Sequence, residues 1–372
     1  MTTLRMDYGR LLGDFTDRDV YLHPFELTVD ESIVGPYMAS FIDATPTWTS
    51  TPYAAALGLS GRPVPPHLLL NLGLSFSVHD VSQQAIAHLA YVRVDFPKPL
   101  PIGGTIRAAS RVMSTRPSSS GDKGVVHVHT VLVDEHGDRV LDFERKALIR
   151  GGELAARPSQ PLGVANLDAG PTAEAWLGRL PEVTFAERLA DWSPPTGMFC
   201  PPLWGRFEDF EAGITLVHAN GRTVGDTEHM RVSAVCRNSH PLHWDKVYSE
   251  TNSFAKERVV YGGLVLAWTL TQSSLDVGGH VIWEQRWQDG AHPAPILAGD
   301  TVFAASQVIS KQAISAHLGE VTLRVVGIKN TRPEALIADG HALFTPERDK
   351  DRGDRIASKV VEITRTILVR RR

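Results

Sequence analysis

The stretch PLPIGGTIRAASRVMS, residues 99–114, and the stretch PILAGDTVFAASQVIS, residues 295–310, decide the fold of this chain. Aligned without a gap, they are identical at eight of sixteen positions, where ordinary residue usage gives about one identity by chance. Similarity between two distant parts of one chain is the signature of a repeated structural unit. The sequence therefore predicts an internal duplication.

The same offset of 195 to 196 residues continues beyond these stretches. VVHVHTVLV from Val125 lines up with EVTLRVVGI from Glu320, and VLDFERKALI from Val140 lines up with ALIADGHALF from Ala335. Two unrelated α+β domains would leave this shared register unexplained. We therefore expect an N-terminal unit, a Pro- and Gly-rich linker, a C-terminal unit and a charged C-terminal segment, at residues 1–150, 151–204, 205–347 and 348–372.

Each unit contains one long apolar run followed by alternating segments. The runs HLLLNLGLSFSV from His67 and GGLVLAWTLTQSS from Gly262 are too long for ordinary strands, and their apolar residues on every side favour helices buried all round. The later segments alternate apolar and polar residues between Gly and Pro turns, which indicates antiparallel strands. The predicted fold class is α+β, with two tandem units that each wrap an antiparallel sheet around a buried central helix.

Composition excludes several classes of function. The chain has 372 residues and a formal net charge of −4, which gives no indication of a nucleic-acid surface. It has two cysteines, Cys200 and Cys236, too few for a disulfide framework, and no stretch that resembles a membrane span or signal peptide. Motifs for nucleotide phosphates are absent as well. We expect a cytoplasmic protein without a nucleic-acid or membrane partner.

A cluster of polar residues lies in the second unit, where Asn238-Ser-His240-Pro-Leu-His243-Trp-Asp245 precedes the turn Tyr261-Gly262-Gly263. This order resembles the MaoC-like, (R)-specific enoyl-CoA hydratase family of hotdog-fold proteins. Their pattern is Gly-Asp-x-Asn-Pro-Leu-His-x-Asp, followed by a His-Gly turn into the central helix. The tandem arrangement and the Asn in place of Asp are most similar to the double-hotdog mesaconyl-CoA hydratases of that family.

The resemblance implies a hydro-lyase that reversibly hydrates a short 2-enoyl-CoA, with mesaconyl-CoA as the favoured substrate and no cofactor or metal. His243 takes the catalytic histidine position, and Asn238 stands where most relatives have Asp. Because an amide cannot accept a proton, His243 must transfer the proton while Asn238 orients the water or the imidazole. The backbone N–H groups of Gly262 and Gly263 are expected to form the oxyanion hole at the start of the buried helix.

Three further residues are expected to bind substrate. Tyr261 replaces the usual His of the family and is expected to line the pocket, and Arg286 is the candidate contact for a carboxylate or a CoA phosphate. Trp48 of the first unit falls on the position of His243 and cannot act as a base, so the first unit is expected to shape the acyl pocket without catalysing. His240 and His243 have the spacing of metal ligands, but no third ligand supports a metal site.

Two alternatives to this function remain open. The chain could act on acyl groups tethered to a carrier protein, or it could be a non-catalytic acyl-thioester binding subunit, as the missing Asp and the presence of Arg237 suggest. The resemblance also implies a homodimer, since hotdog proteins often pair through their sheets.

Overall fold

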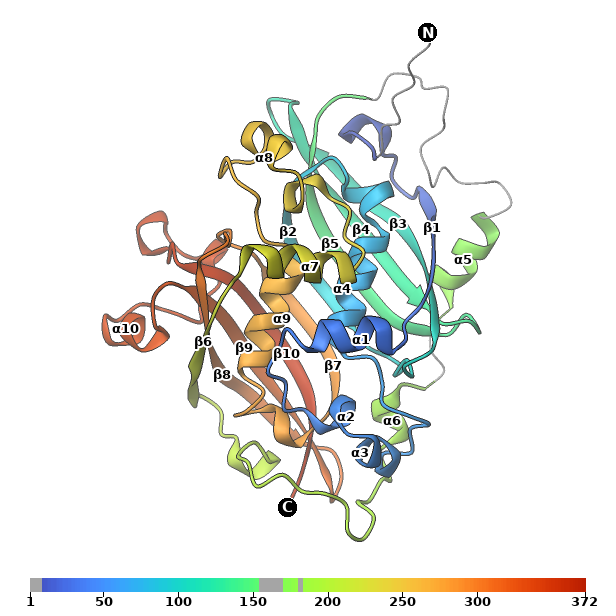
Figure 1. Ribbon diagram of the computed structural model, residues 1–372, viewed down its shortest axis with the longest axis vertical. Coiled ribbons are helices and arrows are strands. Elements are labelled where there is room, and N and C mark those ends of the chain that lie inside the picture. The colour runs from blue at the N-terminus through green and yellow to red at the C-terminus, as the bar shows by residue number, and fades with distance from the viewer. Residues whose placement is uncertain (1–8, 154–169, 180–182) are drawn as a thin grey trace.

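The computed structural model describes residues 9–153, 170–179 and 183–372 (Figure 1). The first residues of the N-terminal unit, and 154–169 and 180–182 of the expected linker, lie outside the described residues. The helix-like part of the linker forms α5, Gly170–Gly178. Its Trp176 and Leu177 pack on the sheet of the first unit against Ala109 and Val131.

One antiparallel sheet runs through both units, with strand order β1-β3-β4-β5-β2-β7-β10-β9-β8-β6. The five strands of each unit form one half of it, and β2 pairs with β7 at the centre. The strands are β1 Val20–Thr28, β2 Ala85–Asp95, β3 Thr105–Pro117, β4 Lys123–Val133, β5 Arg139–Arg150, β6 Thr215–Thr223, β7 Val281–Ala291, β8 Thr301–Ala313, β9 Leu318–Lys329 and β10 Lys359–Arg370.

The two apolar runs form the central helices α4, Pro66–Phe76, and α9, Gly262–Gln272. Every residue of α4 is buried, as are all residues of α9 except Gly262 and Gln272. The two helices contact each other and lie against one face of the sheet (Figure 1). The predicted double-hotdog fold is therefore confirmed.

The helices not yet described are shorter. They are α1 Glu31–Met38, α2 Pro46–Thr49, α3 Thr51–Ala56, α6 Phe185–Arg188, α7 Asp226–Val235, α8 Lys246–Asn252 and α10 Pro333–Ala338. In Figure 1, α1 and α7 pass across the central helices. None of the helices within the described ranges combines the length and apolarity needed to cross a membrane.

The duplication is visible in buried polar contacts as well as in the strand order. Each unit has a buried histidine whose Nδ1 lies 2.7 Å from an aspartate oxygen, and whose Nε2 lies 2.6 Å from a serine hydroxyl in the first unit and 2.9 Å in the second. The two sets are His23, Asp80 and Ser110, and His218, Asp276 and Ser306. Equivalent residues at a shift of 195 to 196 thus make equivalent contacts.

The end of the second unit differs from the sequence-based expectation. Residues 335–344, aligned with β5 in the sequence, lie in α10 and the loop after it. The structural equivalent of β5 is β10, which pairs with both β7 and β9, so residues 348–372 include a strand of the sheet rather than a separate charged segment. The alignment failed because the segment 330–358, which contains α10, is inserted between β9 and β10 and shifts the register.

A buried ion pair connects β10 to β7. The Arg365 Nε donates to both carboxylate oxygens of Glu284 at 2.9 Å, and both side chains are almost fully buried. Replacing Glu284 by Gln leaves the guanidinium charge without its counterion, so we expect the free energy of unfolding to fall by about 3 kcal/mol. Urea denaturation followed by tryptophan fluorescence measures it, and a loss below about 1 kcal/mol would contradict a structural role for this pair.

Candidate active site

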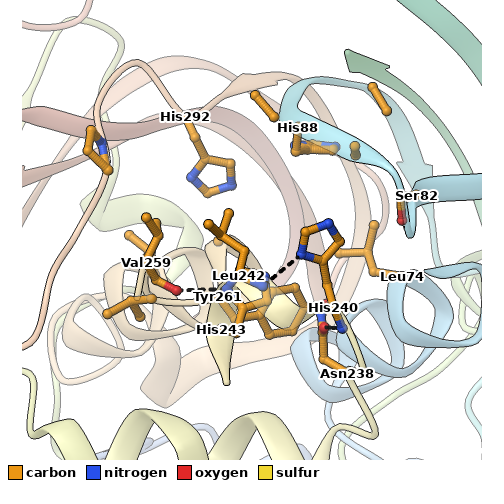
Figure 2. A pocket seen from close by; sticks show the side chains of 18 of the residues that line it. Leu74, Ser82, His88, Asn238, His240, Leu242, His243, Val259, Tyr261 and His292 are labelled. Atoms are coloured by element: carbon orange, nitrogen blue, oxygen red, sulfur yellow. Dashed lines mark hydrogen bonds between the residues drawn. The ribbon is translucent and has the colours of Figure 1, made fainter. Parts of the chain in front are cut away.

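A cavity of about 350 Å³ lies where the two units meet (Figure 2). The first unit contributes the end of α4 and parts of β2 and β5, and the second contributes the 238–243 turn, the start of α9 and residues 292–296. Most of the wall is apolar, and its histidines lie on two sides, with His243 and His240 on one side and His292 and His88 on the other (Figure 2). A largely apolar cavity with a few polar groups is typical of a small-molecule site.

His243 lies at the end of a 3-10 turn, Pro241–His243, and faces this cavity. Its Nδ1 lies 2.7 Å from the carbonyl oxygen of Val259. Because a carbonyl can only accept, Nδ1 carries the proton of the neutral ring, and Nε2 keeps its lone pair. The backbone of residue 259 therefore sets the tautomer that a general base requires.

His240 has the opposite tautomer. Its Nδ1 accepts the backbone N–H of Leu242 at 3.2 Å, so the proton of the neutral ring is on Nε2, which has no acceptor in hydrogen-bond geometry. The two rings are 5.7 Å apart between centroids. His243 is therefore the imidazole whose acceptor nitrogen faces the cavity, while the Nε2–H of His240 is buried within the wall.

Asn238 fixes this turn. Its Oδ1 accepts the backbone N–H of His240 at 2.9 Å, and its carbonyl oxygen accepts from the Trp244 indole at 2.6 Å. The hydrogen bond that orients the His243 imidazole comes from Val259 and not from Asn238. Asn238 therefore holds the backbone between the two histidines.

Burial keeps these imidazoles neutral. It lowers the pKa of His243 to about 4, and it lowers the pKa of His240 to about 3 with a further contribution from His243. Across the cavity, burial lowers the pKa of His292 to about 4. All three rings are uncharged at neutral pH, so Nε2 of His243 is free to accept a proton.

The glycine turn lies beside His243. Gly262 and Gly263 begin α9, so their N–H groups precede the first helical hydrogen bonds, and neither has an acceptor among the described residues. A Cβ on Gly263 would lie 1.8 Å from Oδ1 of Asn71, so only glycine fits here. The helix N-terminus and two unpaired amides form the electrostatic setting that a developing negative charge needs.

The structure brings most of the predicted site residues together. Asn238, Tyr261, Gly262 and Gly263 line the same cavity as His243. The Tyr261 ring lies 5.4 Å from the His243 ring, and its hydroxyl donates to the carbonyl oxygen of Asn71 at 3.2 Å. Tyr261 is thus a rigid part of the wall (Figure 2).

Trp48 and Arg286 are not brought to this cavity, which corrects two expectations. Arg286 is half exposed and pairs with Asp95 at 2.5 Å, because strand alternation turns Trp287 inward and Arg286 outward. The Trp48 indole is buried in the first unit and donates to Oδ2 of Asp43 at 2.7 Å. It fills the position that His243 has in the second unit.

The first unit retains its own buried acid and histidine at the equivalent place. Oδ2 of Asp43 lies 3.3 Å from Nε2 of His67, and its Oδ1 accepts the backbone N–H of Thr45 at 3.0 Å. The bonds to His67, Thr45 and Trp48 lower the pKa of Asp43 despite its burial. These partners leave the Asp43 carboxylate with a structural role.

Several cavity residues were missed from the sequence. Tyr91 and His88 of β2 lie 4.2 Å apart between ring centroids, and Nε2 of His292 lies 3.3 Å from the Tyr91 hydroxyl. Arg145 of β5 also lines the wall. All except His292 belong to the first unit, and only the pairing of β2 with β7 and β5 reveals them, so no local motif could have indicated them.

The chain is similar to known proteins over nearly its whole length. A family model described as mesaconyl-CoA hydratase matches residues 3–184. The mesaconyl-CoA hydratase of Cereibacter sphaeroides is 28% identical over 88% of this chain and 91% of its own length. The β-methylmalyl-CoA dehydratase of Chloroflexus aurantiacus is 27% identical over 87% of this chain and 89% of its own length.

Solved structures share the architecture. A protein described as a MaoC domain dehydratase from Chloroflexus aurantiacus superposes with a TM-score of 0.79 at 24% identity, with full coverage of both chains. A Mycobacterium tuberculosis protein with a double hotdog fold superposes with a TM-score of 0.71 at 17% identity, over 97% of this chain and 98% of its own. The fold is therefore that of the MaoC-like double-hotdog proteins.

Proposed function

We propose that this chain, which is similar over most of its length to a mesaconyl-CoA hydratase and a β-methylmalyl-CoA dehydratase, is a hydro-lyase. It would reversibly hydrate a short 2-enoyl-CoA, favouring mesaconyl-CoA, which gives β-methylmalyl-CoA. One observation carries the proposal: a neutral imidazole with its free Nε2 faces a cavity that also receives the first amides of a buried helix. The named activities of the relatives support the same reaction class.

The proposed chemistry uses these groups in order. Nε2 of His243 takes a proton from a water molecule while the water oxygen bonds to the β carbon, and the electron pair of the double bond moves toward the thioester oxygen. The N–H groups of Gly262 and Gly263 stabilise that oxygen. The imidazolium then returns its proton to the α carbon on the same side, which re-forms the thioester carbonyl and leaves a β-hydroxyacyl-CoA.

Product analysis in heavy-oxygen water tests the proposal. We expect mesaconyl-CoA to gain one water molecule, with the labelled oxygen on the β carbon. The reverse reaction should release that labelled oxygen as water. Comparing a CoA thioester with the same acyl group on a carrier protein separates the alternative carrier. Tight binding of every short 2-enoyl-CoA without any labelled product would instead indicate a binding subunit.

The acid limb of the pH profile is a further prediction. His243 must be unprotonated to act, and its pKa is lowered to about 4, so the active form persists well below the range of an ordinary histidine. At pH 5.5 we expect kcat/KM within about twofold of its value at pH 7.5, whereas a base with the reference pKa of 6.5 would lose about tenfold. A tenfold loss at pH 5.5 with unchanged circular dichroism would contradict the burial of this base.

Two further proposals concern assembly and location. We propose that the chain forms a homodimer, which light scattering of the purified protein tests. The two free cysteines, Cys200 and Cys236, and a CoA thioester substrate support a cytoplasmic location.

A further inference from the structure

Arg145 is the one side chain with a permanent charge in the described wall of the cavity. It comes from β5 of the first unit and is 4% exposed. The other lining residues are apolar, hydroxyl or amide groups and histidines, and none of them is a carboxylate. A buried guanidinium on the wall of a substrate cavity needs a partner to offset its loss of hydration.

The hydrogen bonds of Arg145 do not supply that partner. Its Nη2 donates to the hydroxyls of Ser77 at 2.8 Å and Ser82 at 3.2 Å. Its Nε is buried without an acceptor, and no carboxylate of the described residues pairs with the group. Burial lowers the pKa of Arg145 to about 10, so the guanidinium is still charged at neutral pH. Two neutral hydroxyls therefore face a full positive charge.

The second unit contains an equivalent buried arginine that does have a carboxylate partner. Arg365 is the equivalent of Arg145, because Arg365 faces Trp287 across β7 and β10 as Arg145 faces Tyr91 across β2 and β5. The serine is repeated too, since Nη1 of Arg365 lies 3.5 Å from the Ser273 hydroxyl. In the second unit, however, the carboxylate of Glu284 binds the guanidinium through Nε.

The first unit lacks that carboxylate because His88 stands at the position of Glu284. Ala147 faces His88 across the strands as Ile367 faces Glu284, so the register is the same. Burial lowers the pKa of His88, and the positive charge of Arg145 lowers it further, so the ring is neutral and cannot replace the acid. Arg365 has an internal counterion in Glu284. A counterion for Arg145 would have to come from a molecule bound in the cavity.

We propose that Arg145 binds the carboxylate at the far end of a dicarboxylic acyl group, and that this side chain is the group that makes the site prefer such thioesters over uncharged ones. This inference rests on the proposed function for the identity of the thioester. The substrate carboxylate would supply the negative charge that Glu284 supplies in the second unit. The serines at 77 and 82 hold the guanidinium plane, which makes it a specificity-determining group rather than a catalytic one.

Calorimetric binding of two saturated thioesters tests this independently of turnover. Succinyl-CoA carries the distal carboxylate, and butyryl-CoA has the same chain length without it. We expect wild-type protein to bind succinyl-CoA about 100-fold more tightly, and Arg145→Gln to remove that difference. Lys146→Gln removes one positive charge from the next, exposed residue of β5 and should retain the full difference.

A second variant tests the inference in case Arg145→Gln does not fold. His88→Glu introduces the carboxylate that the second unit has at this position, so Arg145 gains an internal counterion. The affinity for succinyl-CoA should then fall at least 10-fold relative to the affinity for butyryl-CoA. Equal binding of the two thioesters by wild type would overturn the inference, as would an unchanged ratio in a folded Arg145→Gln or His88→Glu. Absence of hydration with a retained binding preference would instead overturn the proposed function alone.

Discussion

Replacing His243 by alanine is expected to lower kcat/KM for a short 2-enoyl-CoA about 1000-fold, the usual size of a lost general base. Nε2 of this imidazole is the free acceptor at the cavity, and no carboxylate of the described wall can take the proton instead. The loss should appear in kcat, because the imidazole contacts the reacting water rather than the CoA portion. Decay of the conjugated enoyl-thioester absorbance measures both constants.

His341→Ala is the matched control, since it removes an exposed imidazole far from the cavity wall. It should retain wild-type kcat/KM. His243→Gln preserves much of the volume and should be as inactive as the alanine variant, because an amide cannot accept the proton. A folded His243→Ala protein with more than about a tenth of wild-type activity would contradict the assignment of the base.

Replacing Gly263 by alanine is expected to lower kcat at least about 100-fold, which is the effect of losing an oxyanion-hole donor. The new Cβ would lie 1.8 Å from Oδ1 of Asn71 and 2.9 Å from the Tyr261 ring. Asn71 cannot easily move, because its Nδ2 donates to the Tyr37 hydroxyl at 3.0 Å and to the Gly263 carbonyl at 3.2 Å. The start of α9 must therefore shift, and with it both N–H groups.

Steady-state kinetics and a thermal melt separate the two parts of this effect. The melting temperature should fall as well, because the shifted turn disturbs packing between α4 and α9. Gly353→Ala is the control, since a Cβ there contacts nothing within 4 Å, and it should leave kcat unchanged. If Gly263→Ala retained wild-type kcat, the glycine amides would not be the oxyanion donors.

Most of the fold could be predicted because its determinants are local and repeated. The apolar runs of α4 and α9 and the turns before β3 and β8 have the same spacing in both units. The last strand could not be placed, since α10 and the turns after it interrupt the register between β9 and β10. When one copy of a repeat contains an insertion, an alignment that keeps a constant offset pairs the wrong residues after the insertion.

The candidate site also has a part that the sequence predicts and a part that it does not. The residues of the second unit lie within one short segment and one helix start, so their proximity follows from the motif. The contribution of the first unit depends on the strand order β5-β2-β7, which places Arg145 and His88 across from the turn of His243. The charge of Arg286 suits a carboxylate or a CoA phosphate, but the alternation of β7 directs Trp287 inward and Arg286 outward.

Hydration of crotonyl-CoA in deuterium oxide tests the central claim most directly, namely that the single imidazole of His243 both takes the proton from water and returns it to the α carbon. The proposed mechanism predicts a product in which deuterium at the α carbon and the hydroxyl group at the β carbon were added to the same face, as resolved by proton NMR coupling. Addition to opposite faces would contradict it.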